Sequence, residues 1–194
     1  KVEFNFYSFE TEKISINGKE FIALTAPKAH QLLEKGAPDL PILRKSIIIS
    51  DDKAVSYRII QSEYVTKSIG ELAPSKGNFT RDIDPATVPY SFSDVYKTKT
   101  YFPANNFSLS SPYVIRDFRG VTMQFNPIQY NPSDKTIKIC TRLVVEVYSN
   151  SNEEAENPLV RNNPFTGISK EYDMVYSRLF ANYGNDGIKY NYIP

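Results

Sequence analysis

The sequence lacks the residues on which many catalytic and metal sites depend. Its 194 residues include one histidine, one cysteine and no tryptophan. A single cysteine excludes an intrachain disulfide, and no paired-histidine or Cys-x-x-Cys spacing suggests a metal. His30 has no catalytic motif around it, and Cys140 is expected within a strand, not at a helix N-terminus where thiols are activated. An enzyme is therefore the least favoured class of protein, and no cofactor or metal is expected.

Charge and hydropathy exclude two further classes of partner. The chain carries 23 basic and 22 acidic side chains, which gives a net charge of +1. No basic block stands out, so a nucleic-acid partner has no electrostatic support. No apolar run approaches the roughly 18 residues of a membrane span. Residues 1–6 already alternate like a strand, so we expect any export signal to have been removed from this sequence.

The residues that are present favour a folded, mainly β chain. Hydrophobic residues make up 41% of the sequence, with 14 tyrosines and 12 phenylalanines. The clearest strand covers residues 136–148 and alternates between an apolar and a mixed face, with Cys140 on the mixed one. Further strands are expected at residues 2–6, 14–16, 21–23, 44–50, 55–60, 64–65, 113–115 and 121–130. Asn17-Gly18 has the chemistry of a type I′ turn between two strands.

One helix is strongly indicated, from about Ser169 to Tyr183. Its apolar residues recur at helical spacing and form one stripe, made by Tyr172, Val175, Tyr176, Leu179, Phe180 and Tyr183. Gly184 is a candidate for the residue that ends it, and a short helix at residues 29–35 is a further candidate. Together these elements predict one antiparallel β-domain over residues 1–184, sandwich-like or jelly-roll-like. Residues 185–194 are expected to be a linker towards a further domain.

A long irregular segment from about residue 71 to residue 112 does not fit a plain sandwich. It is punctuated by Pro74, Pro85, Pro89, Pro103 and Pro112. Unstructured connections longer than roughly 15 residues are uncommon in compact domains unless they are functional. Within this segment Arg81 is a long cation with prolines on either side, so the loop is expected to protrude and present it. Taken alone, the residues favour a solvated loop arginine over a binding one.

Several short motifs occur in a specific order along the chain. In the loop, Pro74-Ser75-Lys76-Gly77 is followed by Thr80-Arg81, by Pro85 and by Val88-Pro89-Tyr90. Further motifs lie at residues 36–43, 116–120, 126–132 and 165–167. In this order they resemble the propeptide of gingipain-type cysteine proteases, peptidase family C25, and within that family the arginine-specific members.

The resemblance implies a β-sandwich that assists the folding of a secreted cysteine protease and keeps it latent. In that family a basic loop residue enters the S1 specificity pocket of the protease, and Arg81 stands at that position. The residues that would support the loop are Lys76, Thr80, Asp82, Pro85, Pro89 and Tyr90. Lys76 is a second candidate for the pocket. The implied partner is the cognate catalytic domain, and the sequence does not indicate an oligomeric state.

The resemblance also implies a processing site and a location. The bond between Lys189 and Tyr190 stands where the family places its processing bond. Arginine-specific members carry arginine there, so this lysine departs from their pattern. The implied location is secreted, periplasmic or on the cell surface of a Bacteroidetes-type bacterium.

Two other interpretations of the sequence stay open. A structural or adhesive β-domain of a secreted surface protein would explain the composition without any role for Arg81. A free-standing protease inhibitor would use Arg81 without an attached protease. A catalytic domain encoded directly after Pro194 would favour the propeptide over both.

Overall fold

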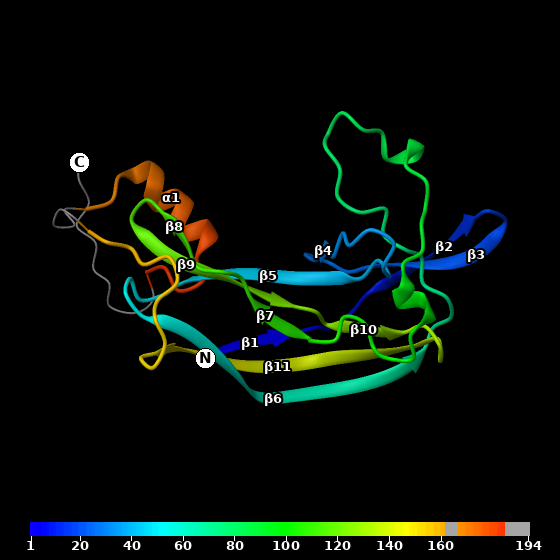
Figure 1. Ribbon diagram of the computed structural model, residues 1–194, viewed down its shortest axis with the longest axis horizontal. Coiled ribbons are helices and arrows are strands. Elements are labelled where there is room, and N and C mark those ends of the chain that lie inside the picture. Colours follow the sequence, from blue (N-terminus) through cyan, green and yellow to red (C-terminus); the bar gives the residue numbers. More distant parts are fainter. Residues whose placement is uncertain (162–166, 185–194) are drawn as a thin grey trace.

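The computed structural model describes residues 1–161 and 167–184 and shows a mainly β chain with one C-terminal α-helix (Figure 1). The predicted antiparallel β architecture is confirmed, because two sheets lie against each other across a shared core. The predicted linker and the Lys189–Tyr190 bond lie outside the described residues. Among the described residues, no helix has the length and apolar character needed to cross a membrane.

The first sheet is organised around β11 (Thr136–Asn150). One edge of β11 pairs with β6 (Ala54–Ser68), and the other pairs with β1 (Val2–Asn5) and β10 (Ile128–Asn131). The register of β6 against β11 shifts between Cys140 and Arg142 and again between Val144 and Val145. The first shift interrupts the alternation of β11. Cys140, expected on the mixed face, is therefore buried.

The second sheet is organised around β9 (Phe118–Phe125), which contributes to nearly every pairing in it. β9 pairs antiparallel with β5 (Pro41–Ile48), β7 (Phe107–Leu109) and β8 (Tyr113–Ile115). The short strand β4 (His30–Gln31) extends the sheet beyond β5. The helix considered at residues 29–35 is therefore wrong. His30 lies opposite Ile42 in a strand pair, where backbone partners decide the conformation.

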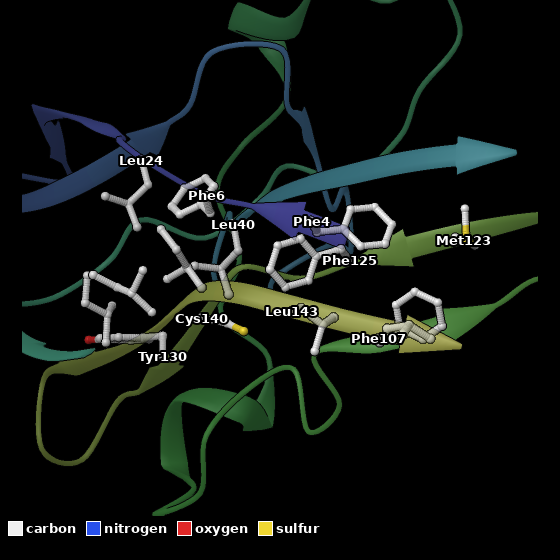
Figure 2. Packing of buried hydrophobic residues seen from close by; sticks show 14 of the residues in the cluster. Phe4, Phe6, Leu24, Leu40, Phe107, Met123, Phe125, Tyr130, Cys140 and Leu143 are labelled. Carbon is white, nitrogen blue, oxygen red and sulfur yellow. The ribbon is translucent and has the colours of Figure 1, made fainter. Parts of the chain in front are cut away.

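The main core lies between the two sheets (Figure 2). Phe4 from β1 packs against Phe125 from β9 with ring centroids 5.3 Å apart, and against Phe107 from β7 at 6.0 Å. Leu143 and Val145 of β11 are fully buried beneath them. Burying each such side chain stabilises the fold by about 1.5–3 kcal/mol. These contacts join strands that are far apart in sequence and hold the two sheets together.

A hairpin extends from one end of the sandwich. It consists of β2 (Glu10–Ile16) and β3 (Lys19–Thr25), which pair over their whole length. Asn17 and Gly18 have φ values of 51° and 79°, the left-handed values that a type I′ turn requires. The predicted turn is confirmed. The first strand β1 does not join this hairpin and pairs with β11 instead.

The C-terminal helix α1 (Lys170–Leu179) packs on the second sheet. Tyr176 and Phe180 are buried against Phe118 of β9, with Phe118–Tyr176 ring centroids 4.8 Å apart. A Cβ atom at Gly120 would lie 2.6 Å from the ring of Phe180, so this close approach requires glycine. The helix ends four residues earlier than predicted because the chain becomes extended at Phe180, and Gly184 therefore does not end it.

A fully buried arginine ties the connection after β5 to the segment after β11. The Arg119 guanidinium donates to the carbonyls of Ser50 and Lys53 at 2.6 and 2.8 Å. It also donates to the carbonyls of Glu156 and Asn157 at 2.5 and 2.9 Å. Four backbone acceptors satisfy the buried cation in place of a carboxylate.

Candidate functional site

The candidate site is the connection between β6 and β7, residues 69–106, whose middle part rises away from both sheets (Figure 1). We call residues 69–80 its rising limb and residues 84–106 its returning limb. The predicted range of 71–112 was too long at its C-terminal end, because residues 107–109 form β7. Two short 3-10 turns interrupt the returning limb, η1 (Pro85–Thr87) and η2 (Asp94–Lys97).

Both limbs are fastened at their base to the same short segment, residues 36–39. Ser75 of the rising limb donates its amide to the Ala37 carbonyl at 2.8 Å and accepts from the Gly36 amide at 2.9 Å. Ser93 of the returning limb donates to the Gly36 carbonyl at 2.8 Å. Gly36 has a φ of +79°, and a Cβ atom there would lie 3.0 Å from the Ser93 amide nitrogen. The base of the loop is therefore closed around a position that only glycine suits.

A half-buried carboxyl group lies in the same base. The amide of Asp39 donates to the Ala73 carbonyl at 3.0 Å. Its side-chain atom Oδ1 is buried and has no hydrogen-bond partner among the described residues. Burial raises the pKa of the Asp39 carboxyl to about 6, an effect that a hydrogen bond from Ser75 partly offsets. The base of the loop therefore holds a group that titrates in the mildly acidic range.

Aromatic side chains support the returning limb from the side of the β2–β3 hairpin. Phe92 packs against Phe21 of β3 at 5.3 Å and against Tyr96 of η2 at 5.0 Å. The Tyr96 hydroxyl donates to the Leu72 carbonyl at 2.8 Å. Sequence reasoning missed this support. The spacing of Phe92 and Tyr96, four residues apart in a proline-bounded segment, was the available signal.

Lys76 connects the two limbs above the base. Its Nζ donates to the Pro85 carbonyl at 2.7 Å and lies 4.5 Å from the centroid of the Tyr90 ring. Three of the predicted support residues therefore meet in one contact. The ammonium of Lys76 is therefore bound within the loop and does not point outwards towards a partner.

The far end of the returning limb is shaped by local capping. The Asp84 carboxylate accepts from the Ala86 amide at 2.9 Å, and the Thr87 hydroxyl donates to the Asp84 carbonyl at 2.8 Å. Pro85 occupies the first position of the short η1 turn, where its fixed φ is compatible. This end of the loop therefore has a defined conformation although it is exposed.

Arg81 lies in a tight turn at the tip. The Ile83 amide donates to the Thr80 carbonyl at 3.1 Å, so Arg81 and Asp82 are the two central residues of this turn. Arg81 is exposed, and its guanidinium has no partner in residues 1–161 or 167–184. A hydrogen bond from Thr80, then one from its own backbone amide, lowers the pKa of the Asp82 carboxyl. The predicted loop residues thus form one unit in which Arg81 is the cation left free.

A β-domain that presents an exposed arginine at the tip of a braced loop has the form of a binding module. The family model described as Propeptide_C25 matches residues 1–185, and the chain therefore belongs to this family of peptidase propeptides. The match is to a propeptide and not to a catalytic domain, which confirms that the chain is not an enzyme. Membership of the family supports a location outside the cell or on its surface.

The curated relatives are gingipains of Porphyromonas gingivalis. Gingipain R1 is 37% identical over 152 residues, which cover 78% of this chain and 15% of the relative. Gingipain R2 is 38% identical over 152 residues, covering 77% of this chain and 20% of the relative. Lys-gingipain is 23% identical over 196 residues, covering 97% of this chain and 11% of the relative. The chain thus spans a fifth or less of the length of these relatives.

Two solved structures share the fold. The complex of Porphyromonas gingivalis RgpB pro- and mature domains contains a chain that matches with a TM-score of 0.81 and 29% identity, covering 93% of this chain and 89% of that one. A structure concerned with the zymogenic latency of gingipain K matches with a TM-score of 0.67 and 22% identity, over 77% and 85% of the two chains. The second likeness concerns the fold alone.

Proposed function

We propose that this propeptide keeps a gingipain-like cysteine protease latent by inserting Arg81 into the S1 pocket of the catalytic domain. The observation that carries the proposal is the contrast between Arg81 and Lys76. Both cations belong to the same loop, yet Lys76 is bound to Pro85 and Tyr90 while Arg81 is exposed in the turn at the tip. The similarity to gingipain R1 and R2 and to the RgpB pro-domain in complex with its mature domain supports the same partner.

Arginine has the chemistry that such a pocket would recognise. Its planar guanidinium can bind a carboxylate through two parallel hydrogen bonds, and it keeps its charge at every physiological pH. We therefore expect an acidic residue in the pocket of the partner. An arginine that becomes desolvated in a pocket is a typical hot spot of a protein interface.

The braced loop would reduce the entropy lost on docking. Lys76, the η1 turn and the base at residues 36–39 restrict the loop before it meets a partner. A loop that is already ordered loses less conformational freedom on binding, so more of the interaction energy remains as affinity. Pro85 and Pro89 act in the same direction because their φ angles are fixed.

The turn would also make the loop a poor substrate. The bond between Arg81 and Asp82 lies in the middle of the Thr80–Ile83 turn. Hydrolysis requires the reacting atoms to be held in a near-attack arrangement. The turn and the Asp82 carboxylate, bound by Thr80, oppose that arrangement, so Arg81 would occupy the pocket without rapid cleavage of the loop.

The proposal assigns the remaining parts of the chain as follows. Residues 1–184 form the inhibitory domain, which also assists folding of the protease, and residues 185–194 lead towards the catalytic domain. Cleavage between Lys189 and Tyr190 would separate the two. Because that residue is a lysine, either the activating protease accepts lysine or cleavage occurs elsewhere. The protein would act after secretion, in the periplasm or at the cell surface.

Titration of an arginine-specific gingipain-type protease with this chain tests the proposal. Wild type, Arg81→Ala and Arg58→Ala are compared, the last as an exposed arginine of β6, outside the loop. We expect tight inhibition by wild type and by Arg58→Ala. Arg81→Ala should inhibit about 30-fold more weakly, which corresponds to a loss of about 2 kcal/mol.

The other outcomes separate the alternatives. Inhibition that survives Arg81→Ala but is lost in Lys76→Ala would transfer the anchor to Lys76. Absence of inhibition by wild type, with the chain folded, would favour a structural or adhesive domain or a partner of other specificity. A lysine-specific gingipain assayed in parallel distinguishes a partner of other specificity from a structural or adhesive role.

A further inference from the structure

The outer edge of β6 is long and exposed. Within the described residues β11 is its partner strand, and Figure 1 shows β6 along the lower margin of the molecule. The exposed apolar side chains of this strand are Tyr57, Ile59, Ile60, Tyr64 and Val65. A long strand edge with free backbone groups is a template for pairing with another strand.

An extra residue in β6 decides which side chains share a face. Ile59 lies opposite Val145 and Gln61 lies opposite the adjacent Val144, so Ile60 is inserted between them. Such an insertion brings side chains an odd number of residues apart onto the same face, whereas a regular strand would separate them.

The contacts of Tyr57 and Tyr64 show that these two residues share one face of β6. Tyr57 and Tyr64 are seven residues apart, yet both reach the segment at residues 106–107. The Tyr57 hydroxyl donates to the Phe107 carbonyl at 3.3 Å, and the Tyr64 hydroxyl accepts from Asn106 Nδ2 at 2.6 Å. The two tyrosines therefore project from the same face, one on each side of the insertion.

The opposite face of β6 carries Arg58 and Glu63, two side chains of opposite charge, one on each side of the inserted residue. Arg58 pairs with Glu146, and Glu63 pairs with Arg142 at 3.4 Å. Arg142 and Glu146 are four residues apart on a stretch of β11 that has no inserted residue, so they share a face. Arg58 and Glu63 therefore also share a face, again with one on each side of Ile60.

This arrangement makes the edge complementary to itself. In an antiparallel pair of β6 strands related by a two-fold axis, residue 60 of one copy can lie opposite residue 61 of the other. In that register Arg58 faces the second copy's Glu63, and Tyr57 faces the second copy's Tyr64. Each contact occurs twice by symmetry. Each residue of one copy also lies on the same face of the sheet as the residue opposite it in the second copy. The inserted Ile60 makes this possible. No two side chains of like charge lie opposite each other.

We propose that the chain self-associates through the edge of β6 as a two-fold antiparallel dimer. The two four-stranded sheets then form one continuous sheet. The interface would involve residues 55–66 of each copy, fewer than the roughly 20–30 residues a side of a standard interface. The dimer is therefore expected to be of the weak, transient kind that small interfaces form. The Arg81 loop lies elsewhere in the molecule, so the proposal does not depend on the inhibitory mechanism.

Charge-reversal variants test the register directly. Arg58→Glu places glutamates opposite each other twice, and Glu63→Arg does the same with arginines. In an equimolar mixture of the two variants, each glutamate faces an arginine. Sedimentation velocity from about 5 to about 500 μM should show a dimer for wild type, weakening of at least about tenfold for each variant alone, and restored association in the mixture. Lys13→Glu, on the exposed hairpin, should associate like wild type.

Several results would overturn the proposal. Wild type that stays monomeric up to about 500 μM would do so, as would a mixture that associates no better than its components. Amides of β6 that become protected from hydrogen exchange only on addition of the catalytic domain would assign the edge to that partner instead. Because restoration in the mixture requires both variants to be folded, a trivial folding defect cannot produce the expected result.

Discussion

Lys76 occupies a position where one side chain decides how well the loop is ordered. It bridges residues that are nine apart in sequence through a hydrogen bond to Pro85, and its ammonium lies over the ring of Tyr90. A hydrogen bond from a charged group contributes about 1.5–3 kcal/mol, and an exposed cation–π contact about 0.5–1 kcal/mol. In a segment without regular secondary structure at its tip, contacts of this size determine which conformation is populated.

Replacing this lysine should therefore loosen the loop without unfolding the domain. Lys76→Met keeps the apolar stem and removes the ammonium. We expect inhibition of the protease to weaken by about 5- to 20-fold, which corresponds to about 1–2 kcal/mol, with an unchanged midpoint of thermal unfolding. Amide hydrogen exchange at residues 80–87 should accelerate. Lys99→Met, an exposed lysine of the returning limb, is the matched control. Equal exchange rates in wild type and Lys76→Met would contradict the role.

The segment at residues 36–39 makes the loop part of the domain. Its backbone binds both limbs, and the half-buried Asp39 lies next to these contacts. Tyr96, packed nearby, has a pKa raised chiefly by burial and so stays neutral across the mildly acidic range. The charge state of this base therefore changes mainly through Asp39.

The Asp39 carboxyl should make stability depend on pH. Its native pKa of about 6 lies above its ordinary value of 3.8, so the folded state binds more protons between these values. Stability should therefore fall as the pH rises through this window and level off above it. Asp39→Asn should remove this contribution, which urea unfolding at pH 4, 5, 6 and 7.5 would measure. Glu12→Gln, at an exposed position of the hairpin, should retain the wild-type slope. An unchanged slope in Asp39→Asn would show that Asp39 does not titrate in this window.

Strand periodicity indicated β11 because one face of this strand is largely buried. The alternation in residues 136–148 and the Asn17-Gly18 turn both reflect local rules, and both elements are present. The pairing of β1 was not predictable in this way, since alternation indicates a buried face but not the partner strand. The helix considered at residues 29–35 was wrong for a related reason. A few polar and apolar residues fit a helix as well as a short strand.

For the candidate site, the sequence indicated the residues but not their contacts. The motif order pointed to Arg81 and its neighbours, and the structure joins three of those neighbours, Lys76, Pro85 and Tyr90, in one contact. The base formed by residues 36–39 was not predicted as part of the site. Its contacts to Ser75 and Ser93 bring together residues far apart in sequence. A single sequence carries no local signal for such contacts.

Arg119 connects distant parts of the chain across the whole domain. Its four carbonyl acceptors come from the turn after β5 and from the segment that follows β11. No apolar side chain can replace these contacts, because removal of the cation leaves several carbonyls without a donor in a buried site.

Arg119→Met should accordingly lower the free energy of unfolding by about 3 kcal/mol or more. Urea denaturation would measure it. Arg44→Met is the matched control, because the Arg44 guanidinium is exposed and bonds only Gln124 at 3.0 Å among the contacts described. Its substitution should cost no more than about 0.5 kcal/mol. A loss of similar size in both variants would refute a special role for the buried guanidinium.

The pairing of β1 with β11 has a consequence for how the protein is made. Residues 2–5 have their partners at residues 142–145, so β1 is synthesised long before the strand with which it pairs. Folds closed by such distant pairs fold slowly, since a long loop must close before the pairing stabilises the chain. The contacts that brace the Arg81 loop lie within residues 21–96, so all the residues that brace it are synthesised before β11. In the proposed mechanism, the inhibitory loop can therefore be braced before β11 completes the first sheet.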